Sequence, residues 1–534
     1  MYESIQLFAG QSDSTEFTAS IEKISECIAK LKKDKSDGDI GLWSNHLIYA
    51  PKAILTHIAL LFTAMMVHGY TPERLLLTTI ISIIKDPSKD ICSSNNYRGI
   101  ALSSCLNKLF DIFILQQYPK CFKTCDLQFA YKTNHSTSLC TLMMKEIAHY
   151  YISKGSQVYS ALLDASKAFD RVRLDKLIEL LQVRETPAPI MRILVTTFHR
   201  QKVRTTWSKE HSDIFLCTNG LRQGGVLSPI LFSVYFDELI RRLSLCGSGC
   251  YIGHMFAGSL VYADDITLLA PTAKGLQTLL NVCAEFSKDF DVIFNSSKSV
   301  CIKLGKNNQL PYPPVVLNGD LLTWSATVTH LGNIVTEKLT NAADINFKAN
   351  DLVKRINSLL VNFRHLSREA VTKLFDTQCV FHGSQQWDLT DNKAIESIHV
   401  KWRKGVRRLW NLPWTARSSI LPPLINKCSF TDQLFKRFVK LYWSILKGDN
   451  TTVKLIVTVA NGGIIDRNLL HICREWNCQR KDLPVASLMP RISEADKMRA
   501  SQLKELTSCL EGNTRLPNFT NDDIRTLIIF IATL

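Results

Sequence analysis

Two adjacent carboxylates, Asp264 and Asp265, interrupt an otherwise apolar stretch that runs from Ser259 to Ala270. Leu260–Tyr262 and Ile266–Leu269 contain β-branched and aromatic residues that favour strands, so the stretch predicts a tight hairpin with both carboxylates at its turn. A buried pair of like charges repels itself and is costly to desolvate unless a cation neutralises it. The residues alone leave two interpretations open, a divalent metal site and a solvated turn.

A third carboxylate, Asp164, follows the apolar run from Gln157 to Leu163, which predicts a strand with Asp164 at its exit. Such a set of carboxylates suits two Mg²⁺ ions, with Mn²⁺ as an alternative. Mg²⁺ takes a few oxygen ligands from protein and others from substrate phosphates, and two such ions assist both oxygens of a phosphoryl transfer. The three carboxylates therefore favour a nucleoside triphosphate as substrate.

Two cations and a glycine-rich loop fit the same chemistry. Lys85 follows a predicted strand, Leu75–Ile84, and Arg98 lies a little further along the chain. Both are either solvated loop residues or clamps for the negative triphosphate. The loop Asn219–Pro229 leads into a predicted helix, Ile230–Leu243, and its glycines would let the backbone approach a ligand closely.

The composition is that of a globular, basic protein. A chain of 534 residues with 46% hydrophobic content is long enough for several packed domains. Its 64 Lys and Arg against 48 Asp and Glu give a net charge of +16, which favours a polyanionic partner such as nucleic acid. The 16 cysteines include no C-x-x-C pair, so no zinc framework is predicted.

The same sequence predicts an intracellular protein, nuclear or cytoplasmic, without a membrane partner. The first residues lack the basic and apolar regions of a secretory signal. The longest apolar run, Ala53–Val67, is too short to span a bilayer comfortably, so we expect a buried helix.

Periodicity predicts the remaining elements. Val315–Leu317 and Val328–Val335 are strand-like and joined through Asn318-Gly319, which is compatible with a small hairpin. The last residues, Leu527–Leu534, predict a strand or a helix. Helical spacing marks Phe17–Leu31, Pro51–His68, Leu174–Leu181, Leu276–Phe290, the chain from Ile345 onward, and Ile395–Trp410.

The helix Ile395–Trp410 is strongly basic beside its apolar stripe. Solvated charge that covers a core helix and contact with nucleic acid explain this pattern equally well. Its basic residues are Lys401, Arg403, Lys404, Arg407 and Arg408.

Three motifs in this order resemble the palm of reverse transcriptases, specifically those of non-LTR (LINE-type) retrotransposons. They are Asp164-x₄-Phe169-Asp170, Arg222-Gln-Gly-Gly-Val-Leu-Ser-Pro229 and Tyr262-Ala-Asp-Asp265. Ala130 departs from the family, which usually has glycine there. Supporting motifs are Asn96-Tyr-Arg98-Gly-Ile, Gln128-Phe-Ala-Tyr-Lys-x₃-Ser136-Thr137, Asn295-x-x-Lys298 and His330-Leu-Gly332.

The resemblance implies a role for each matching residue. Asp164 and Asp264 would bind the metals, with Asp265 beside them as a third catalytic carboxylate. Phe169 would be the aromatic gate that excludes a ribose 2′-hydroxyl, with core packing as the other interpretation. Tyr262 would pack beneath the primer end, where ordinary core packing also competes. Gln223 and Gly224 would line the nucleotide and template, and Lys298 would sit near the leaving pyrophosphate.

The resemblance also implies an α+β right-hand polymerase with fingers, an antiparallel-sheet palm, a helical thumb and a mainly helical C-terminal region. We expect a helical N-terminal extension at 1–63, fingers and palm at 64–336, the thumb and basic helices at 337–450, and a region of unknown role at 451–534. Neither an endonuclease nor a Cys/His cluster is recognisable, so the chain resembles the polymerase portion of a longer element or a copy shortened at its start.

The implied reaction is synthesis of DNA on an RNA template. The partners would be that RNA, a DNA primer or nicked target DNA, and deoxynucleoside triphosphates. Two alternatives stay open: a catalytically inactive relic that only binds nucleic acid, and a polymerase that synthesises RNA.

Overall fold

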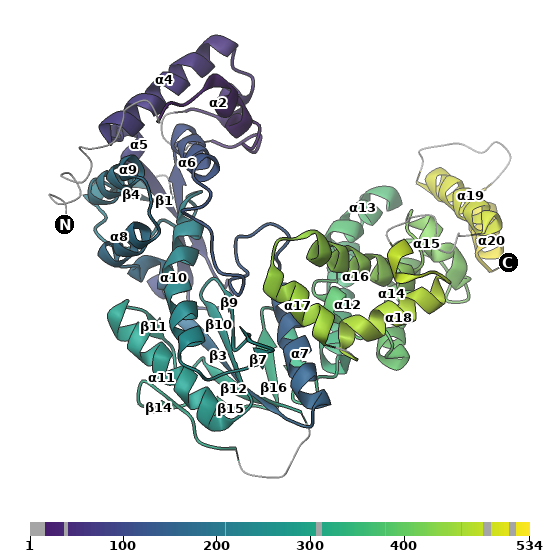
Figure 1. Cartoon of the computed structure of the whole chain (residues 1–534). Helices are drawn as coiled ribbons and strands as arrows, with labels where there is room; N and C mark the ends of the chain where they lie inside the picture. The colour runs from purple at the N-terminus through teal and green to yellow at the C-terminus, as the bar shows by residue number, and fades with distance from the viewer. Residues whose placement is uncertain are drawn as a thin grey trace.

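The computed structural model describes residues 17–36, 41–208, 210–305, 312–379, 381–460, 462–483, 493–511 and 520–533. Figure 1 shows three parts: N-terminal helices with a first sheet, a central second sheet, and a large helical region beside it. The three motifs singled out in the sequence lie on the second sheet and on the loops that join it to the first.

The N-terminal part is a small helical cluster. Ser20 accepts the backbone N–H of Lys23 and caps α2, which is shorter at both ends than the expected Phe17–Leu31. The Ala53–Val67 run is helical, but it is not fully buried as expected, since Ile54 and Leu60 are 40% and 63% exposed. These helices are α2 (Ile21–Ile28), α3 (Ser44–Ile48), α4 (Lys52–His68) and α5 (Glu73–Leu76).

The first sheet occupies the position of the predicted fingers. Its order is β2-β1-β4-β5, with β6 paired to β4; β1 and β4 are parallel and the other pairs antiparallel. The strands are β1 (Leu77–Ile84), β2 (Tyr97–Ser103), β4 (Lys202–Trp207), β5 (Glu210–His211) and β6 (Phe215–Leu216). Nearby helices are α6 (Cys105–Gln117), α8 (Leu174–Val183) and α9 (Ala188–His199).

The second sheet has the order β15-β12-β3-β10-β9, and β11 also pairs with β3. Along the central strands β12, β3, β10 and β9, each strand is antiparallel to its neighbour, as expected for a palm. Its strands are β3 (Val158–Ser166), β9 (Ser259–Tyr262), β10 (Asp265–Ala270), β11 (Ile293–Phe294), β12 (Val300–Leu304) and β15 (Thr323–Trp324).

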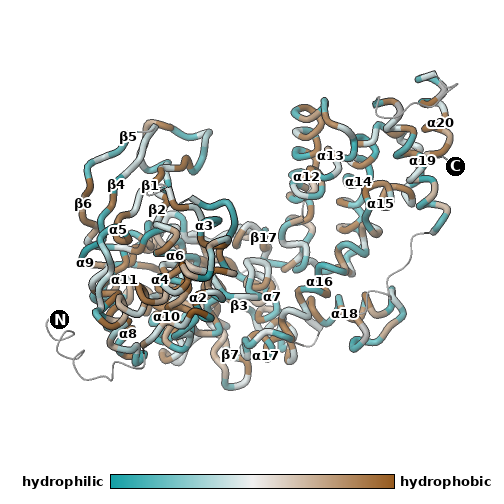
Figure 2. The backbone as a smooth tube through the Cα atoms, turned by 90° about the horizontal axis from the view of Figure 1, so that it is seen from above, coloured by the Kyte–Doolittle hydropathy of each residue, from teal (hydrophilic) through white to brown (hydrophobic). Residues whose placement is uncertain are grey.

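Helices cover this sheet from two sides. The views in Figures 1 and 2 place α10 (Ser228–Leu245) and α11 (Ala273–Asp289) on one side and α7 (Thr137–Ser153) on the other. The apolar face predicted for α11 is buried, from Leu276 to Phe286. Every residue of β10 after Asp265 is buried, because packed helices and strands surround it.

The small hairpins differ from the prediction. The Asn318-Gly319 turn joins β13 (Val316–Leu317) to β14 (Asp320–Leu321) rather than to Val328–Val335. That second segment forms a hairpin of its own, β16 (Thr327–His330) with β17 (Asn333–Thr336). Another short hairpin pairs β7 (Tyr251–Ile252) with β8 (Met255–Phe256).

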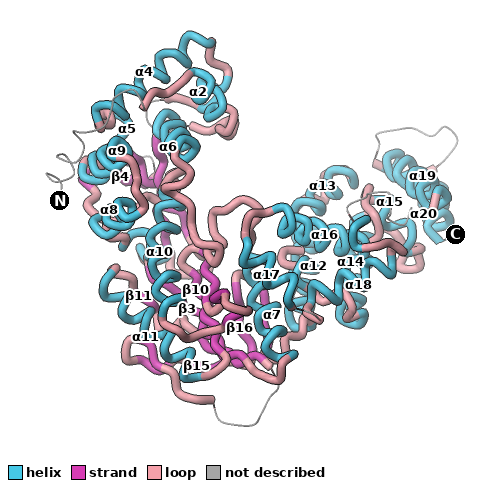
Figure 3. Tube along the Cα trace, in the orientation of Figure 1, coloured by secondary structure: helices cyan, strands magenta, loops and turns pink. Residues whose placement is uncertain are grey.

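The rest of the described chain is helical, as Figure 3 shows, and Leu527 onward is helix rather than strand. The expected boundary at 450/451 falls in the loop before α17, whereas the one at 63/64 falls inside α4. The helices are α12 (Ala342–Asn362), α13 (Arg368–Gln378), α14 (Asn392–Leu409), α15 (Leu421–Leu424), α16 (Phe430–Lys447), α17 (Thr451–Val459), α18 (Ile464–Glu475), α19 (Glu494–Leu510) and α20 (Asn521–Thr533).

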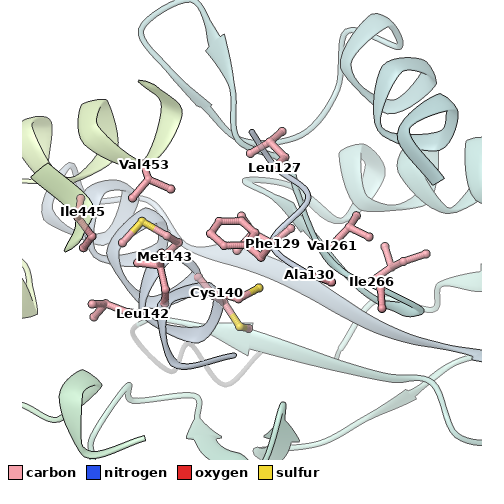
Figure 4. Packing of buried hydrophobic residues seen from close by; sticks show 14 of the residues in the cluster. Leu127, Phe129, Ala130, Cys140, Leu142, Met143, Val261, Ile266, Ile445 and Val453 are labelled. Atoms are coloured by element: carbon pink, nitrogen blue, oxygen red, sulfur yellow. The ribbon is translucent and has the colours of Figure 1, made fainter. Parts of the chain in front are cut away.

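Helix α7 joins the helical region to the second sheet. In Figure 4 its Cys140 and Met143 lie between Val453 of α17 and Val261 of β9. Its Glu146 carboxylate accepts the N–H of Ile465 at 3.0 Å, in the first turn of α18. A carboxylate at a helix N-terminus satisfies free N–H groups and complements the helix dipole.

Candidate active site

The predicted hairpin forms, with two corrections to the placement of its carboxylates. Asp264 lies at the turn after Ala263, which has a φ of 58°, but Asp265 is already the first residue of β10. Asp164 lies inside β3 rather than at its exit, because the strand continues to Ser166. Asp265 is therefore paired with Asp164 across the two strands, and directly opposed residues place their side chains on the same face.

The turn of this hairpin is held by the buried side chain of Gln128. Its Oε1 accepts the N–H of Ala263 at 3.2 Å and that of Ala130 at 3.1 Å. The N–H of Phe129 donates to the carbonyl of Val261 at 2.7 Å, which continues the contact along β9. The left-handed conformation in this loop falls on Tyr131 (φ 58°), so alanine is accommodated at position 130.

The three carboxylates form a region of negative charge that nearby cations compensate only in part. Burial and then the charges of Asp264 and Asp164 raise the pKa of Asp265 to about 6, although its side chain is partly open to solvent. Burial also raises the pKa of Asp264, and Asp164 raises it further, while Arg98 offsets part of this. Lys298 Nζ lies 3.7 Å from Asp164 Oδ2 and supplies a partial counter-charge.

This donor set fits divalent cations that share their ligands with a substrate. Within the described ranges no group of three or more His, Cys, Asp or Glu side chains, the three aspartates included, is arranged as a protein cage that could hold a metal ion by itself. Mg²⁺ needs no such cage, since one or two carboxylates, water and substrate phosphates complete its shell. The repulsion that raises the pKa of Asp264 and Asp265 is what a bound cation would relieve.

A cleft of about 660 Å³ lies between the two sheets and reaches Asp264. Its size is within the range of small-molecule sites. Of the predicted nucleotide-binding residues, Lys85, Arg98, Phe169 and Gln223 line this cleft. Lys85 is exposed, and its Nζ also donates to the carbonyl of Asn95 at 2.9 Å. The structure thus brings these four residues together with Asp264, one of the predicted catalytic carboxylates.

Phe169 is held at the cleft wall by aromatic packing. Its ring stacks on Phe232 of α10, with centroids 4.0 Å apart and planes inclined by 4°. Its carbonyl accepts the N–H of Leu221 at 2.8 Å, which joins the turn after β3 to the glycine-rich loop. Both predicted roles are compatible with this position, since the residue lines the cleft and also packs against the core.

The glycine-rich loop is fitted tightly against β2. The N–H of Ala101 donates to the carbonyl of Gln223 at 2.6 Å. Gly224 has a φ of 114°, and a Cβ there would lie 2.6 Å from the carbonyl oxygen of Ala101. A side chain at position 224 would therefore strain the backbone and separate the loop from the strand. Gly224 does not line the cleft itself. Its close contact with β2 holds the neighbouring Gln223, which does line the cleft.

Three residues that contribute to the site were given no role in the sequence analysis, although Gln128 is part of a supporting motif. Lys167 lines the cleft and has a left-handed backbone conformation, with a φ of 50°. Its position between Asp164 and Phe169 in the sequence could have indicated that it belongs to the site. Gln128 holds the catalytic turn. Asp111 accepts the N–H of Leu227 at 3.3 Å, and burial raises its pKa to about 6. Asp111 thereby supports the glycine-rich loop from α6, a contact that local sequence patterns do not indicate.

Lys298 and Tyr262 lie beside the carboxylates rather than in the cleft. Tyr262 is half-buried on β9 directly opposite Asp265, and burial raises its pKa. Lys298 is exposed and faces Asp164, as its distance shows. Both are near enough to the carboxylates for the predicted roles, which stay predictions.

The basic residues of α14 differ in their partners. Arg403 pairs with Glu396, and Arg407 donates to the carbonyl of Ala416, so both are engaged within the helical region. Lys404 is exposed. Lys401 and Arg408 donate hydrogen bonds to α12, Lys401 to Asn350 and Arg408 to Asn357, each at 2.8 Å. On both helices the two residues are seven positions apart. The apolar stripe of α14 is buried as predicted.

Asp164 and Asp265 are directly opposed on a sheet whose neighbouring central strands are antiparallel, as the resemblance to a reverse transcriptase palm implies. Residues 84–335 match the family described as "Reverse transcriptase (RNA-dependent DNA polymerase)". This stretch of the chain therefore matches a reverse transcriptase domain, and the chain is similar to proteins of non-LTR retrotransposons. The prediction of an α+β right-hand polymerase fold is confirmed.

Known relatives match this chain over part of their length. An RNA-directed DNA polymerase from mobile element jockey of Drosophila funebris is 24% identical over 78% of this chain and 47% of its own length. A Pol polyprotein from type-1 retrotransposable element R2 of Nasonia vitripennis is 29% identical over 41% of this chain and 21% of its own. The chain thus spans less than half of either relative.

A solved structure of apo telomerase from Candida tropicalis, truncated from the C-terminal domain, is also similar. It shares 12% identity over 53% of this chain and 59% of its own, with a TM-score of 0.36. Among the helices in the described ranges, we find none that combines the length and apolar character needed to cross a bilayer.

Proposed function

We propose that this chain is an RNA-directed DNA polymerase that adds deoxynucleotides to a primer 3′-hydroxyl on an RNA template, as part of a retrotransposon. The observation that carries the proposal is the pairing of Asp164 with Asp265, with Asp264 at the adjoining turn and at the edge of a cleft of about 660 Å³. The match of residues 84–335 to the reverse transcriptase family supports the reaction class.

The three aspartates would hold two Mg²⁺ ions. When bound, Mg²⁺ supplies Lewis acidity to the attacking and leaving oxygens of the phosphoryl transfer. The residues of the chain supply the positioning. Lys85, Arg98 and Lys167 would hold the triphosphate in the cleft, because phosphate oxygens need charge-assisted partners.

The remaining cleft residues would select and orient the nucleotide. The Phe169 ring, fixed on Phe232, would occupy the space of a ribose 2′-hydroxyl and so favour deoxynucleotides. Gln223 would contact the new base pair, since the tight fit of Gly224 on Ala101 fixes its position. Lys298 beside Asp164 would face the departing pyrophosphate. The exposed cations of α14 would hold the duplex backbone.

Primer extension tests this function. The purified chain is incubated with oligo(dT) on poly(rA), Mg²⁺ and either dTTP or UTP. We expect extension with dTTP and little with UTP. A relic would bind the template-primer without extending it, and an RNA-synthesising enzyme would prefer UTP. Either result would contradict the proposal.

A further inference from the structure

A buried histidine links the catalytic strand to the helical region. His330 ends β16, and the two-residue turn that follows has Leu331 at φ 49° and Gly332 at φ 77°. Two successive left-handed residues make a type I′ turn, which sets His330 opposite Asn333. Both side chains are almost fully buried, with 3% and 0% exposure, so their polar atoms need partners inside the protein.

The His330 ring is bonded at both nitrogens. Nε2 lies 2.9 Å from Oγ1 of Thr267, two residues after Asp265 on β10. Nδ1 lies 2.9 Å from Oγ1 of Thr141 on α7. The Thr141 hydroxyl donates to the carbonyl of Thr137 at 3.1 Å, so it accepts from Nδ1–H and leaves Nε2 to accept from Thr267.

The other side of the same hairpin is fixed to α12. Asp344 Oδ1 accepts the N–H of Ile334 at 2.8 Å, and Lys348 Nζ donates to the carbonyl of Gly332 at 2.6 Å. Asp344 is itself held by the indole N–H of Trp387 at 2.7 Å. The hairpin thus connects β10, which carries Asp265, with the first helix of the expected thumb.

We propose that His330 is a positioning residue for polymerisation, which holds β10 in a fixed relation to α12 through Thr267. The inference rests on the proposed function, because it concerns how a primer-template held by the helical region meets the carboxylates. Apolar contacts tolerate sliding, whereas hydrogen bonds at both ring nitrogens fix distance and orientation. Small displacements matter, since misplacement by about 1 Å costs up to about 100-fold in rate.

Single-nucleotide incorporation by the full chain tests this role. His330→Phe keeps a ring without hydrogen bonds, Thr267→Val keeps the shape of threonine, and Thr267→Ser keeps the hydroxyl. We expect kcat to fall about tenfold or more in the Phe and Val variants, with the KM for dTTP within about twofold of wild type. The serine variant should retain wild-type kcat, and the Phe/Val double variant should be no slower than the slower single variant.

The outcomes separate this role from the proposed function. A wild-type chain that extends no primer overturns the proposed function and this role with it. If the wild type is active, unchanged kcat in both His330→Phe and Thr267→Val overturns the role of His330 alone. The role of His330 is also overturned if the losses of kcat in the two single variants add up in the double variant, or if Thr267→Ser is as slow as Thr267→Val. Either result indicates general damage to the core. Thermal unfolding of each variant identifies that damage directly.

Discussion

Asp164 and Asp265 face each other across β3 and β10 as directly paired residues of an antiparallel ladder. They come from parts of the chain about a hundred residues apart, yet the register places both carboxylates on one face. Asp264 follows at the turn, where Gln128 holds the backbone of Ala263. The charge of the three groups is concentrated because strands, rather than flexible loops, position two of them.

Replacement of Phe169 by valine should relax sugar selection. The smaller side chain opens the space that the ring occupies beside Phe232, so we expect UTP use relative to dTTP to rise by roughly tenfold or more. Competitive incorporation assays on poly(rA) measure the ratio. Phe232→Leu is the matched control, since it removes the stacking partner and keeps the ring. An unchanged ratio in Phe169→Val would remove Phe169 from the gate.

The cations of α14 should differ in their contribution to duplex binding. Lys404→Ala and Arg408→Ala should each reduce the slope of log affinity against log salt by about one, because each releases about one counterion. Arg403→Ala should leave the slope unchanged, since Glu396 already neutralises that side chain. Fluorescence anisotropy with an RNA–DNA duplex at several salt concentrations gives the slopes. A reduced slope in Arg403→Ala, with unchanged slopes in Lys404→Ala and Arg408→Ala, would contradict the predicted contact surface.

Gly224→Ala should weaken nucleotide binding. The new methyl group would meet the carbonyl of Ala101 and displace Gln223, and the left-handed backbone adds strain of about 1–3 kcal/mol. We expect a raised KM for dTTP in primer extension. Gly319→Ala is the control, because Gly319 has a similar φ of 94° but open space around it. Equal KM values in the two variants would show that contact with β2 is unimportant.

Glu146 should make the protein less stable as pH rises. Burial raises the pKa of Glu146 from 4.5 to about 7 in the folded chain. Between pH 4.5 and about 7, Glu146 is therefore mostly protonated in the folded chain and mostly ionised in the unfolded chain. Stability is therefore lost as pH rises towards about 7, by an amount of the order of 3 kcal/mol. Glu146→Gln keeps an acceptor for Ile465 N–H and removes this titration.

Urea unfolding at pH 5 and pH 8 measures the effect of Glu146. The stability of Glu146→Gln relative to wild type should increase between the two pH values. Other buried groups such as Asp111 titrate in both proteins, so their contributions cancel in the comparison. A difference that is the same at both pH values would contradict a raised pKa at Glu146.

Local patterns predicted the elements near the site well. The hairpin that carries Asp264 and the apolar stripe of α14 were predictable because residue alternation and helical spacing reflect burial directly. The separate β16–β17 hairpin was missed because its turn has Leu331 in the left-handed conformation, where Asn or Gly is the usual signal.

Contacts between distant segments could not be predicted in this way. The docking of α17 depends on Asp126, whose carboxylate accepts the N–H of Thr451 from 325 residues away. The same holds for Glu146 and α18, and for the bridge from His330 to Thr267. Each of these polar groups is common in solvated positions, so only the packed chain reveals its partner.

The most direct test of the central claim is primer extension on poly(rA) by Asp264→Asn. Asparagine keeps the shape of aspartate but removes the charge that would hold Mg²⁺, so we predict loss of extension with template-primer affinity within about twofold of wild type. Asp320→Asn, on the exposed strand β14, is the control and should extend normally. Extension by Asp264→Asn at the wild-type rate would contradict the assignment of these aspartates as the catalytic centre.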